Sequence, residues 1–185
     1  MHKIILAGYG GQGMLLCGQI LANAAMIDGF HVTWFPTYGP EMRGGAAACS
    51  VVISGKPIGS PAIKSAGLIA VMSQPAFDKY HSHVEAGGYM MYNSELVTPQ
   101  DKRTDIMYVD AEYSRLSAEL GNLKVANMLV LGGINEILSC VSATALNQVI
   151  RNVFGEKDKA LAELNENAIE VGIKTVKGHP LFQPQ

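Results

Sequence analysis

A glycine-rich turn between an apolar strand pattern and an apolar helix pattern is the feature that most constrains this chain. Residues 3–7 read as a short buried strand, and apolar residues recur at helical spacing from Leu15 to Ala25. Glycines without β-carbons let the backbone approach a phosphate, and the start of a helix supplies free N–H groups. The turn therefore predicts an anion-binding site, with tight packing of strand on helix as the alternative reason for the glycines. Its sequence is Gly8-Tyr9-Gly10-Gly11-Gln12-Gly13, which satisfies the pattern G-x-G-x-x-G.

The other parts of a dinucleotide-binding signature are missing. An NAD site needs an acidic residue near the end of the second strand to bind the ribose. The second strand pattern, residues 31–35, is followed by Pro36, and Asp28 precedes the strand and so lies at its wrong end. No Gly-Lys-Ser/Thr sequence ends the turn, so a nucleoside-triphosphatase loop is disfavoured as well. The prediction is a phosphate or carboxylate site rather than a dinucleotide site.

A second loop, residues 36–45, is too rich in Pro and Gly for a helix or a strand. It follows the second strand at the edge of the sheet where open α/β folds bind ligands, so we expect it near the glycine turn. Arg43 offers a planar donor fork suited to phosphate or carboxylate, and a local ion pair with Glu41 is the alternative. The candidate site residues in this loop are Tyr38, Gly39, Pro40, Glu41, Arg43, Gly44 and Gly45.

Strand and helix patterns alternate along the first two thirds of the chain, and helix patterns fill the last third. We expect a parallel pair from the strands at 3–7 and 31–35, and a break at Gly87-Gly88. The predicted fold is α/β, a Rossmann-like open, mostly parallel sheet flanked by helices, as one domain over 1–177 with a tail at 178–185. The other strand patterns lie at 46–53, 68–72, 89–92 and 105–109, and the other helix patterns at 75–84, 111–120, 125–138, 144–153 and 157–176.

Composition disfavours several classes of partner. The 185 residues carry a formal net charge of -2 with 14 Lys and Arg, which gives no cationic surface for nucleic acid. No apolar run reaches the roughly 20 residues of a membrane span, and no cleavable leader is recognisable, so we expect a cytoplasmic protein. The three cysteines are widely spaced and read as small buried hydrophobes. Scattered histidines form no metal pattern, and no catalytic residue is predicted.

Several motifs, in their order and spacing, resemble one enzyme family. The glycine turn is followed by Val32-Thr33-Trp34, by the run from Tyr38 to Gly45 and by Pro57-Ile58-Gly59-Ser60-Pro61. Gln74-Pro75, Asn127-Met128, Leu131-Gly132 and Asn167-Ala168-Ile169 before Gly172 continue the pattern. Together they resemble the gamma subunit of thiamine-diphosphate-dependent 2-oxoacid:ferredoxin oxidoreductases over nearly the whole chain.

The resemblance implies oxidative decarboxylation of a 2-oxoacid to an acyl-CoA, with electrons passing to ferredoxin. The chain would act only with alpha and beta subunits, and a ferredoxin-like delta subunit where one exists. Those partners would hold thiamine diphosphate, Mg and iron-sulfur clusters, and this chain alone would hold no cofactor. We hypothesise that Gly10, Gly11, Gln12 and Gly13, with Arg43, contact coenzyme A or the neighbouring catalytic subunit.

Among family members, the loop at 38–45 and the run at 59–61 favour 2-oxoglutarate as the substrate. Pyruvate, branched-chain 2-oxoacids and aryl pyruvates remain open. Two other functions are compatible with the residues: a free-standing module that binds NAD, and a purely structural subunit that touches no ligand.

Overall fold

The computed structural model describes residues 1–37, 46–155 and 158–183. Six strands of these residues form one sheet in the order β2-β3-β1-β4-β5-β6. β3 is antiparallel to both of its neighbours, whereas β1, β4, β5 and β6 pair in parallel. The predicted α/β fold with a mostly parallel sheet is therefore confirmed. The strands are β1 (His2–Tyr9), β2 (His31–Thr37), β3 (Ala46–Ser54), β4 (Ala66–Val71), β5 (Val84–Asn93) and β6 (Met107–Ala111).

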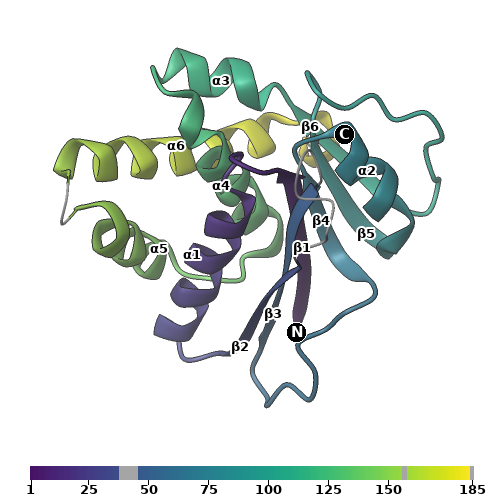
Figure 1. Cartoon of the computed structure of the whole chain (residues 1–185), viewed down its shortest axis with the longest axis horizontal. Coiled ribbons are helices and arrows are strands. Elements are labelled where there is room, and N and C mark those ends of the chain that lie inside the picture. Colours follow the sequence, from purple (N-terminus) through teal and green to yellow (C-terminus); the bar gives the residue numbers. More distant parts are fainter. Residues whose placement is uncertain (38–45, 156–157, 184–185) are drawn as a thin grey trace.

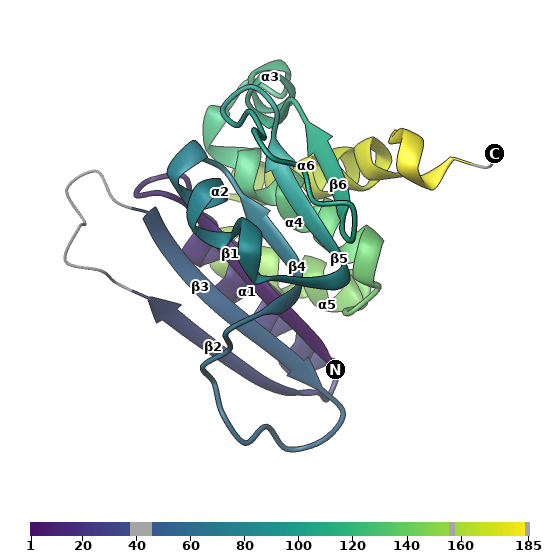
Figure 2. The ribbon, with the colours of Figure 1, turned by 90° about the vertical axis from the view of Figure 1, so that its right-hand side faces the viewer.

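Helices cover both faces of this sheet unequally (Figure 1). α1, α4, α5 and α6 lie on one face, and α2 lies on the other over β1 and β4 (Figure 2). β1 is buried on both faces, because Ile4 and Leu6 join the core under the four helices while Ile5 and Ala7 join the core under α2. The helices are α1 (Met14–Ile27), α2 (Gln74–Tyr80), α3 (Tyr113–Glu119), α4 (Ala126–Leu138), α5 (Ala143–Ile150) and α6 (Lys159–Gly178).

The predicted parallel pairing of the first two strands is wrong. β3 lies between them and pairs with β1 along all eight residues from His2 to Tyr9. β2 pairs with the other edge of β3 and is an outermost strand of the sheet. β2 and β3 are close in sequence and pair in antiparallel fashion, and β3 takes the position beside β1 that was predicted for β2. The local pattern of strand, helix and strand does not reveal this insertion, because it lacks the segment that is inserted.

Two predicted loops or breaks belong to strands instead. β2 continues through Pro36 and Thr37, because proline is tolerated on an edge strand whose outer side needs no hydrogen bond. β5 runs through Gly87 and Gly88 with a register shift against β4. A β-carbon on Gly88 would lie 2.7 Å from the carbonyl oxygen of Gly67, so glycine there permits close approach of the strands. The helix predicted over 75–84 ends at Tyr80 and is followed by a 3₁₀ turn, His81–His83.

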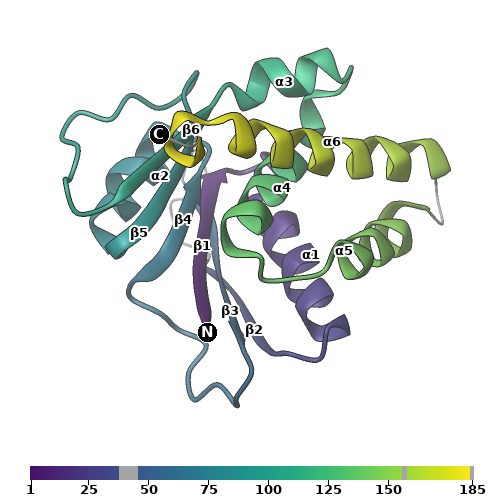
Figure 3. The ribbon, with the colours of Figure 1, turned by 180° about the vertical axis from the view of Figure 1, so that it is seen from behind.

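α4 is the most enclosed helix described. Met128, Leu129, Val130 and Leu131 are consecutive and all buried, so this helix packs against the core on several sides. α6 crosses α4 closely, as the view from behind shows (Figure 3). Packing of α4 against other elements of this chain, α6 above all, therefore accounts for the apolar residues at 125–138.

Candidate functional site

The glycine turn lies at the carboxyl end of the parallel strands, where the chain leaves β1 for α1. β4 is hydrogen-bonded beside β1 and leads into α2 on the opposite face of the sheet. The connections that leave these two neighbouring strands thus diverge to opposite faces. A divergence of this kind leaves a crevice at the strand ends, and open α/β sheets bind ligands there.

The four motif glycines form two pairs that differ in their surroundings. A β-carbon on Gly8 would lie 2.5 Å from Oε1 of Gln12, and one on Gly13 would lie 2.4 Å from Nδ2 of Asn127. A β-carbon on Gly10 or Gly11 would meet no described atom within 4 Å. Gly11 has a φ of 94°, which glycine adopts without steric cost. Tight packing therefore accounts for Gly8 and Gly13, whereas Gly10 and Gly11 leave backbone open to a ligand.

Gln12 uses both ends of its side-chain amide within the chain. Its Oε1 accepts a hydrogen bond from the backbone N–H of Tyr9 at 2.6 Å, and its Nε2 donates to the carbonyl of Met72 at 2.8 Å. The N–H of Met72 in turn donates to the carbonyl of Ala7 at 2.9 Å. The Gln12 side chain therefore bridges the ends of β1 and β4 just beyond their last paired residues.

α1 begins directly after the turn with backbone N–H groups that no side chain of the described residues caps. Gly13 occupies the N-cap position with a φ of 74°, and the N–H of Cys17 makes a bond to its carbonyl at 2.9 Å. The N–H groups that precede Cys17 in the first turn have no partner within the helix. The first turn contains no acidic residue, so the partial positive charge of the helix start is available to an anion.

A cleft of about 290 Å³ opens beside the turn. Leu96 and Leu123 give it apolar, exposed walls, and the exposed fraction of Leu123 is 65%. Lys124 is the one charged residue among the described residues that line it. The cleft thus combines an open glycine backbone, apolar walls and a single cation. Its lining residues are Gly11, Gln12, Met72, Leu96, Ser114, Ser117, Leu123, Lys124 and Ala126.

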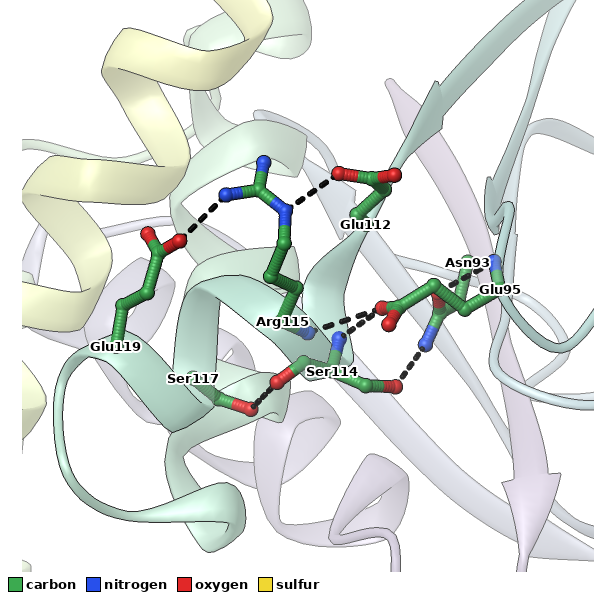
Figure 4. Close-up of polar contacts among 7 residues, drawn as sticks. All are labelled: Asn93, Glu95, Glu112, Ser114, Arg115, Ser117 and Glu119. Carbon is green, nitrogen blue, oxygen red and sulfur yellow. Dashed lines mark hydrogen bonds and ion pairs between the residues drawn. The ribbon is translucent and has the colours of Figure 1, made fainter.

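A polar network fixes the wall that α3 contributes (Figure 4). Oε2 of Glu95 accepts hydrogen bonds from the N–H groups of Ser114 and Arg115 at 2.8 and 3.0 Å. Nδ2 of Asn93 donates to Oγ of Ser114 at 2.8 Å, and Ser117 donates to the carbonyl of Ser114 at 2.9 Å. These bonds satisfy the start of α3 from within the chain, so this helix end is not free to bind a ligand.

The charge of Arg115 is also neutralised within this network. Its guanidinium donates to Glu112 and to Glu119, one on either side along α3 (Figure 4). These hydrogen bonds raise the pKa of Arg115, and the arginine stays charged. Lys124 is therefore the cation that the described structure offers to an anion in the cleft.

The second predicted loop has its ends at the same edge of the sheet. Tyr38, Gly39, Pro40, Glu41, Arg43, Gly44 and Gly45 lie outside the described residues. Thr37, which precedes them, pairs with Ala48, and Ala46, which follows them, pairs with Tyr9 of the glycine turn. One anchor, Ala46, thus stands beside the glycine turn, and the other, Thr37, lies one strand further out on β2.

Asp28 has a structural partner far from the cleft. Its carboxylate accepts hydrogen bonds from the N–H and the Oγ of Ser142 at 2.6 and 2.7 Å. Ser142 is the N-cap of α5, so Asp28 ties the end of α1 to the start of α5. The prediction that Asp28 lies at the wrong end of β2 for a ribose is confirmed by this position.

The cysteines are buried as predicted, and burial raises the pKa of Cys49 and Cys140 to about 12. His81 is structural, because its Nε2 lies 2.5 Å from the hydroxyl of Tyr108. Within the described ranges, no three His, Cys, Asp or Glu side chains gather in a group that could hold a metal ion. None of the helices described here is both long and apolar enough to cross a membrane.

Comparison with known proteins decides the family. The model of the pyruvate ferredoxin/flavodoxin oxidoreductase family matches residues 3–175. The chain belongs to this family. Among curated relatives in the oxidoreductase family, the 2-oxoglutarate synthase subunit KorC of Methanocaldococcus jannaschii is 33% identical over 178 residues. That match covers 95% of this chain and 94% of KorC.

A second relative is much longer than this chain. The ketoisovalerate oxidoreductase subunit VorA of Methanothermobacter marburgensis is 33% identical over 175 residues, which cover 92% of this chain. The chain spans only 35% of the length of VorA. This family therefore contains both chains of similar size and chains in which the same domain is one part.

Solved structures agree with this membership. The gamma subunit of a keto/oxoacid ferredoxin oxidoreductase from Geobacter sulfurreducens superposes with a TM-score of 0.84 at 28% identity, and the match covers 97% of this chain and 100% of that one. A 2-oxoglutarate:ferredoxin oxidoreductase from Magnetococcus marinus shares the fold, with a TM-score of 0.89 at 22% identity over 96% of this chain and 31% of that one. The resemblance to oxidoreductase gamma subunits that the motifs indicated is confirmed.

Sequence reasoning missed much of the cleft of this oxidoreductase-family chain. Lys124, Leu96 and Leu123 lie in connections whose local sequence contains no ligand-binding pattern. Asn127 was singled out in the sequence only as part of a motif shared with the family. Its side chain nevertheless bonds Gly13, which lies 114 positions away in the sequence. A contact over that separation is fixed by how α4 packs beside α1, so spacing along the chain could not have revealed it.

Proposed function

We propose that this chain is the gamma subunit of a 2-oxoacid:ferredoxin oxidoreductase. The assembled enzyme would convert a 2-oxoacid to an acyl-CoA and pass electrons to ferredoxin, with thiamine diphosphate, Mg and iron-sulfur clusters held by partner subunits. The observation that carries the proposal is a cleft with binding groups at the ends of β1 and β4, which the described residues line with no carboxylate, imidazole or thiol. A site of that composition binds and orients a ligand, and the chemistry then belongs to partners.

We propose further that the cleft contacts coenzyme A, whose phosphates are anionic and whose pantetheine arm is largely uncharged. The open backbone at Gly10 and Gly11, the start of α1 and Lys124 suit the phosphates. Met72 and Leu96 suit the uncharged arm. At about 290 Å³ the cleft is at the lower limit of small-molecule sites, so it would hold only part of coenzyme A. Arg43, in the segment between β2 and β3, would add a second cation.

The test is kinetic and uses the assembled complex. Lys124→Ala and Arg43→Ala are each expected to raise the KM for coenzyme A by roughly three- to tenfold, the size of one charge-assisted contact, with a smaller change in kcat. Lys56→Ala is the matched control, because Lys56 is an exposed lysine in the turn after β3. If both variants keep the KM of the parent enzyme, the cleft does not contact coenzyme A and a purely structural subunit is the better description.

We propose 2-oxoglutarate as the preferred 2-oxoacid. Relatives with comparable identity are named for 2-oxoglutarate and for ketoisovalerate, so the proposal is supported mainly by the loop at 38–45 and the run at 59–61. Initial rates of the complex with 2-oxoglutarate, pyruvate, a branched-chain 2-oxoacid and an aryl pyruvate would rank kcat/KM directly. A higher value for any of the other three would reject the preference and leave the gamma-subunit proposal intact.

A further inference from the structure

The glycine turn is fixed at both ends by side-chain amides. Gln12 holds the first half of the turn. Its side-chain amide makes hydrogen bonds with the N–H of Tyr9 and the carbonyl of Met72, and these tie the turn to the end of β4. The amide of Gln12 also occupies the space where a side chain on Gly8 would begin. The position of the Gln12 amide thus requires glycine at position 8.

Asn127 holds the second half from a different part of the chain. It lies at the start of α4, and its Nδ2 donates to the carbonyl of Gly13 at 3.1 Å. A β-carbon on Gly13 would collide with this amide, and the φ of 74° there also requires glycine. Gly13 and Asn127 therefore form a second matched pair, which fixes the peptide at the start of α1.

Asn127 is buried with only one end of its side-chain amide hydrogen-bonded among the described residues. The residue is 3% exposed, and its Oδ1 is buried without a hydrogen-bond partner among the described residues. An unpaired buried oxygen costs stability, so an apolar residue of the same shape would suit the core at least as well. The hydrogen bond to the carbonyl of Gly13 is what an amide supplies at position 127 and an apolar side chain does not.

We infer that Gln12 and Asn127 are positioning residues, whose side-chain amides hold Gly10 and Gly11 in the conformation that receives the ligand. The two amides act on the ligand through the backbone of Gly10 and Gly11, which lies between the two fixed ends of the turn. Of the motif glycines, these two have open space beside them. This inference rests on the proposed contact between the turn and coenzyme A. It assigns a role at the site to Asn127, a buried residue of α4 that does not line the cleft.

The experiment compares near-isosteric variants in the assembled complex. Gln12→Met and Asn127→Leu remove the hydrogen bonds of the side-chain amides and keep a similar side-chain volume. Each is expected to raise the KM for coenzyme A roughly tenfold with a smaller change in kcat, because a displaced backbone weakens ligand binding. The midpoint of thermal unfolding of Asn127→Leu is expected to stay close to that of the parent.

Asn135→Leu is the matched control on the same helix. The Asn135 amide bonds the N–H and the carbonyl of Val141 at 3.1 and 3.0 Å, away from the turn. Its loss is expected to lower the unfolding midpoint and to leave the KM for coenzyme A unchanged. A rise in KM equal to that of Asn127→Leu would show a general effect of destabilising α4 and would overturn the inference.

Gly10→Ala separates this inference from the function on which it rests. The methyl group enters open space, so it leaves the fold intact and occupies the volume of the ligand. If Gly10→Ala raises the KM while Gln12→Met and Asn127→Leu do not, the turn binds coenzyme A but the two amides do not position it. If all three variants keep the parent KM, the contact with coenzyme A is wrong and the positioning role is rejected with it.

A double variant tests the pairing inside the turn. Gly8→Ala alone places its methyl group 2.5 Å from the Gln12 amide oxygen, and in the Gln12→Ala background only the looser contacts at 3.2 Å with Met14 and Met72 are left. The KM of the double variant is therefore expected to lie within about twofold of Gln12→Ala alone. Fully additive effects of the two changes would show that Gly8 and Gln12 act independently and would contradict their assignment as a pair.

Discussion

At the scale of single residues, the two tyrosines near α3 differ in how their hydroxyl groups are satisfied. Tyr113 is fully buried, and its hydroxyl has no hydrogen-bond partner among the described residues. Burial strongly raises the pKa of this phenol. Tyr113→Phe removes an unpaired polar atom and no hydrogen bond, so we expect the free energy of unfolding to stay the same or rise by up to about 1 kcal/mol. Urea unfolding of the two proteins measures the difference.

Tyr108→Phe is the control for that prediction. The Tyr108 hydroxyl accepts from the N–H of Arg103 at 2.7 Å and lies 2.5 Å from Nε2 of His81. Its loss is expected to lower the free energy of unfolding by about 1–2 kcal/mol. If Tyr113→Phe were as destabilising as Tyr108→Phe, the buried hydroxyl of Tyr113 would have a partner after all.

His81 gives the stability of the chain a dependence on pH. The Tyr108 hydroxyl accepts from the N–H of Arg103 and can donate its own proton to an unprotonated Nε2 of His81, a bond that favours the neutral ring. Burial lowers the pKa of His81, and the positive charge of Arg103 lowers it further, against the opposite effect of Asp101, Asp105 and Asp78. The unfolded chain therefore binds the proton more readily than the folded one.

The sign of the effect follows from that difference in proton binding. The contribution of His81 to stability is complete above the unfolded pKa of about 6.5 and is lost as pH falls through the lower folded pKa. Between about pH 7.5 and about pH 5.5, we expect the unfolding free energy of the parent to fall more steeply than that of His81→Gln. Equal slopes for the two proteins would show that His81 is not held neutral by Tyr108.

At the scale of elements, the crossing of α4 and α6 depends on two glycines. A β-carbon on Gly132 would lie 2.1 Å from the carbonyl oxygen of Ile169, and one on Gly172 would lie 2.0 Å from that of Leu129. Both contacts are with backbone, which cannot rotate away as a side chain can. Gly132→Ala or Gly172→Ala must therefore separate the helices, and we expect each to lower the free energy of unfolding by about 1–3 kcal/mol or more.

Gly178→Ala is the control within α6. No described atom lies within 4 Å of a β-carbon there, so the change is expected to be neutral or to stabilise the helix by up to about 1 kcal/mol. Denaturant midpoints of the three variants give the comparison. A Gly172→Ala protein as stable as Gly178→Ala would mean that the two helices can move apart at little cost.

At the scale of the whole molecule, sequence predicted what depends on neighbouring residues. The first strand, the glycine turn and the start of α1 follow from local periodicity. The position of β3 between β1 and β2 could not be predicted, because it depends on pairing between distant segments. The cleft falls in the same class, since Lys124 and Leu96 reach it through the packing of α3 and α4.

The proposed role as one subunit of an enzyme makes a prediction for the isolated chain. Under that proposal one turn, one helix start and one lysine bind the ligand, and partner subunits supply the reacting groups. Purified alone, the chain is therefore expected to oxidise no 2-oxoacid and to retain no NAD on dialysis, because Asp28 is engaged with Ser142. Rates with and without partner subunits, and equilibrium dialysis against NAD, measure both. Turnover by the isolated chain would place the chemistry here and contradict a role as one subunit among several.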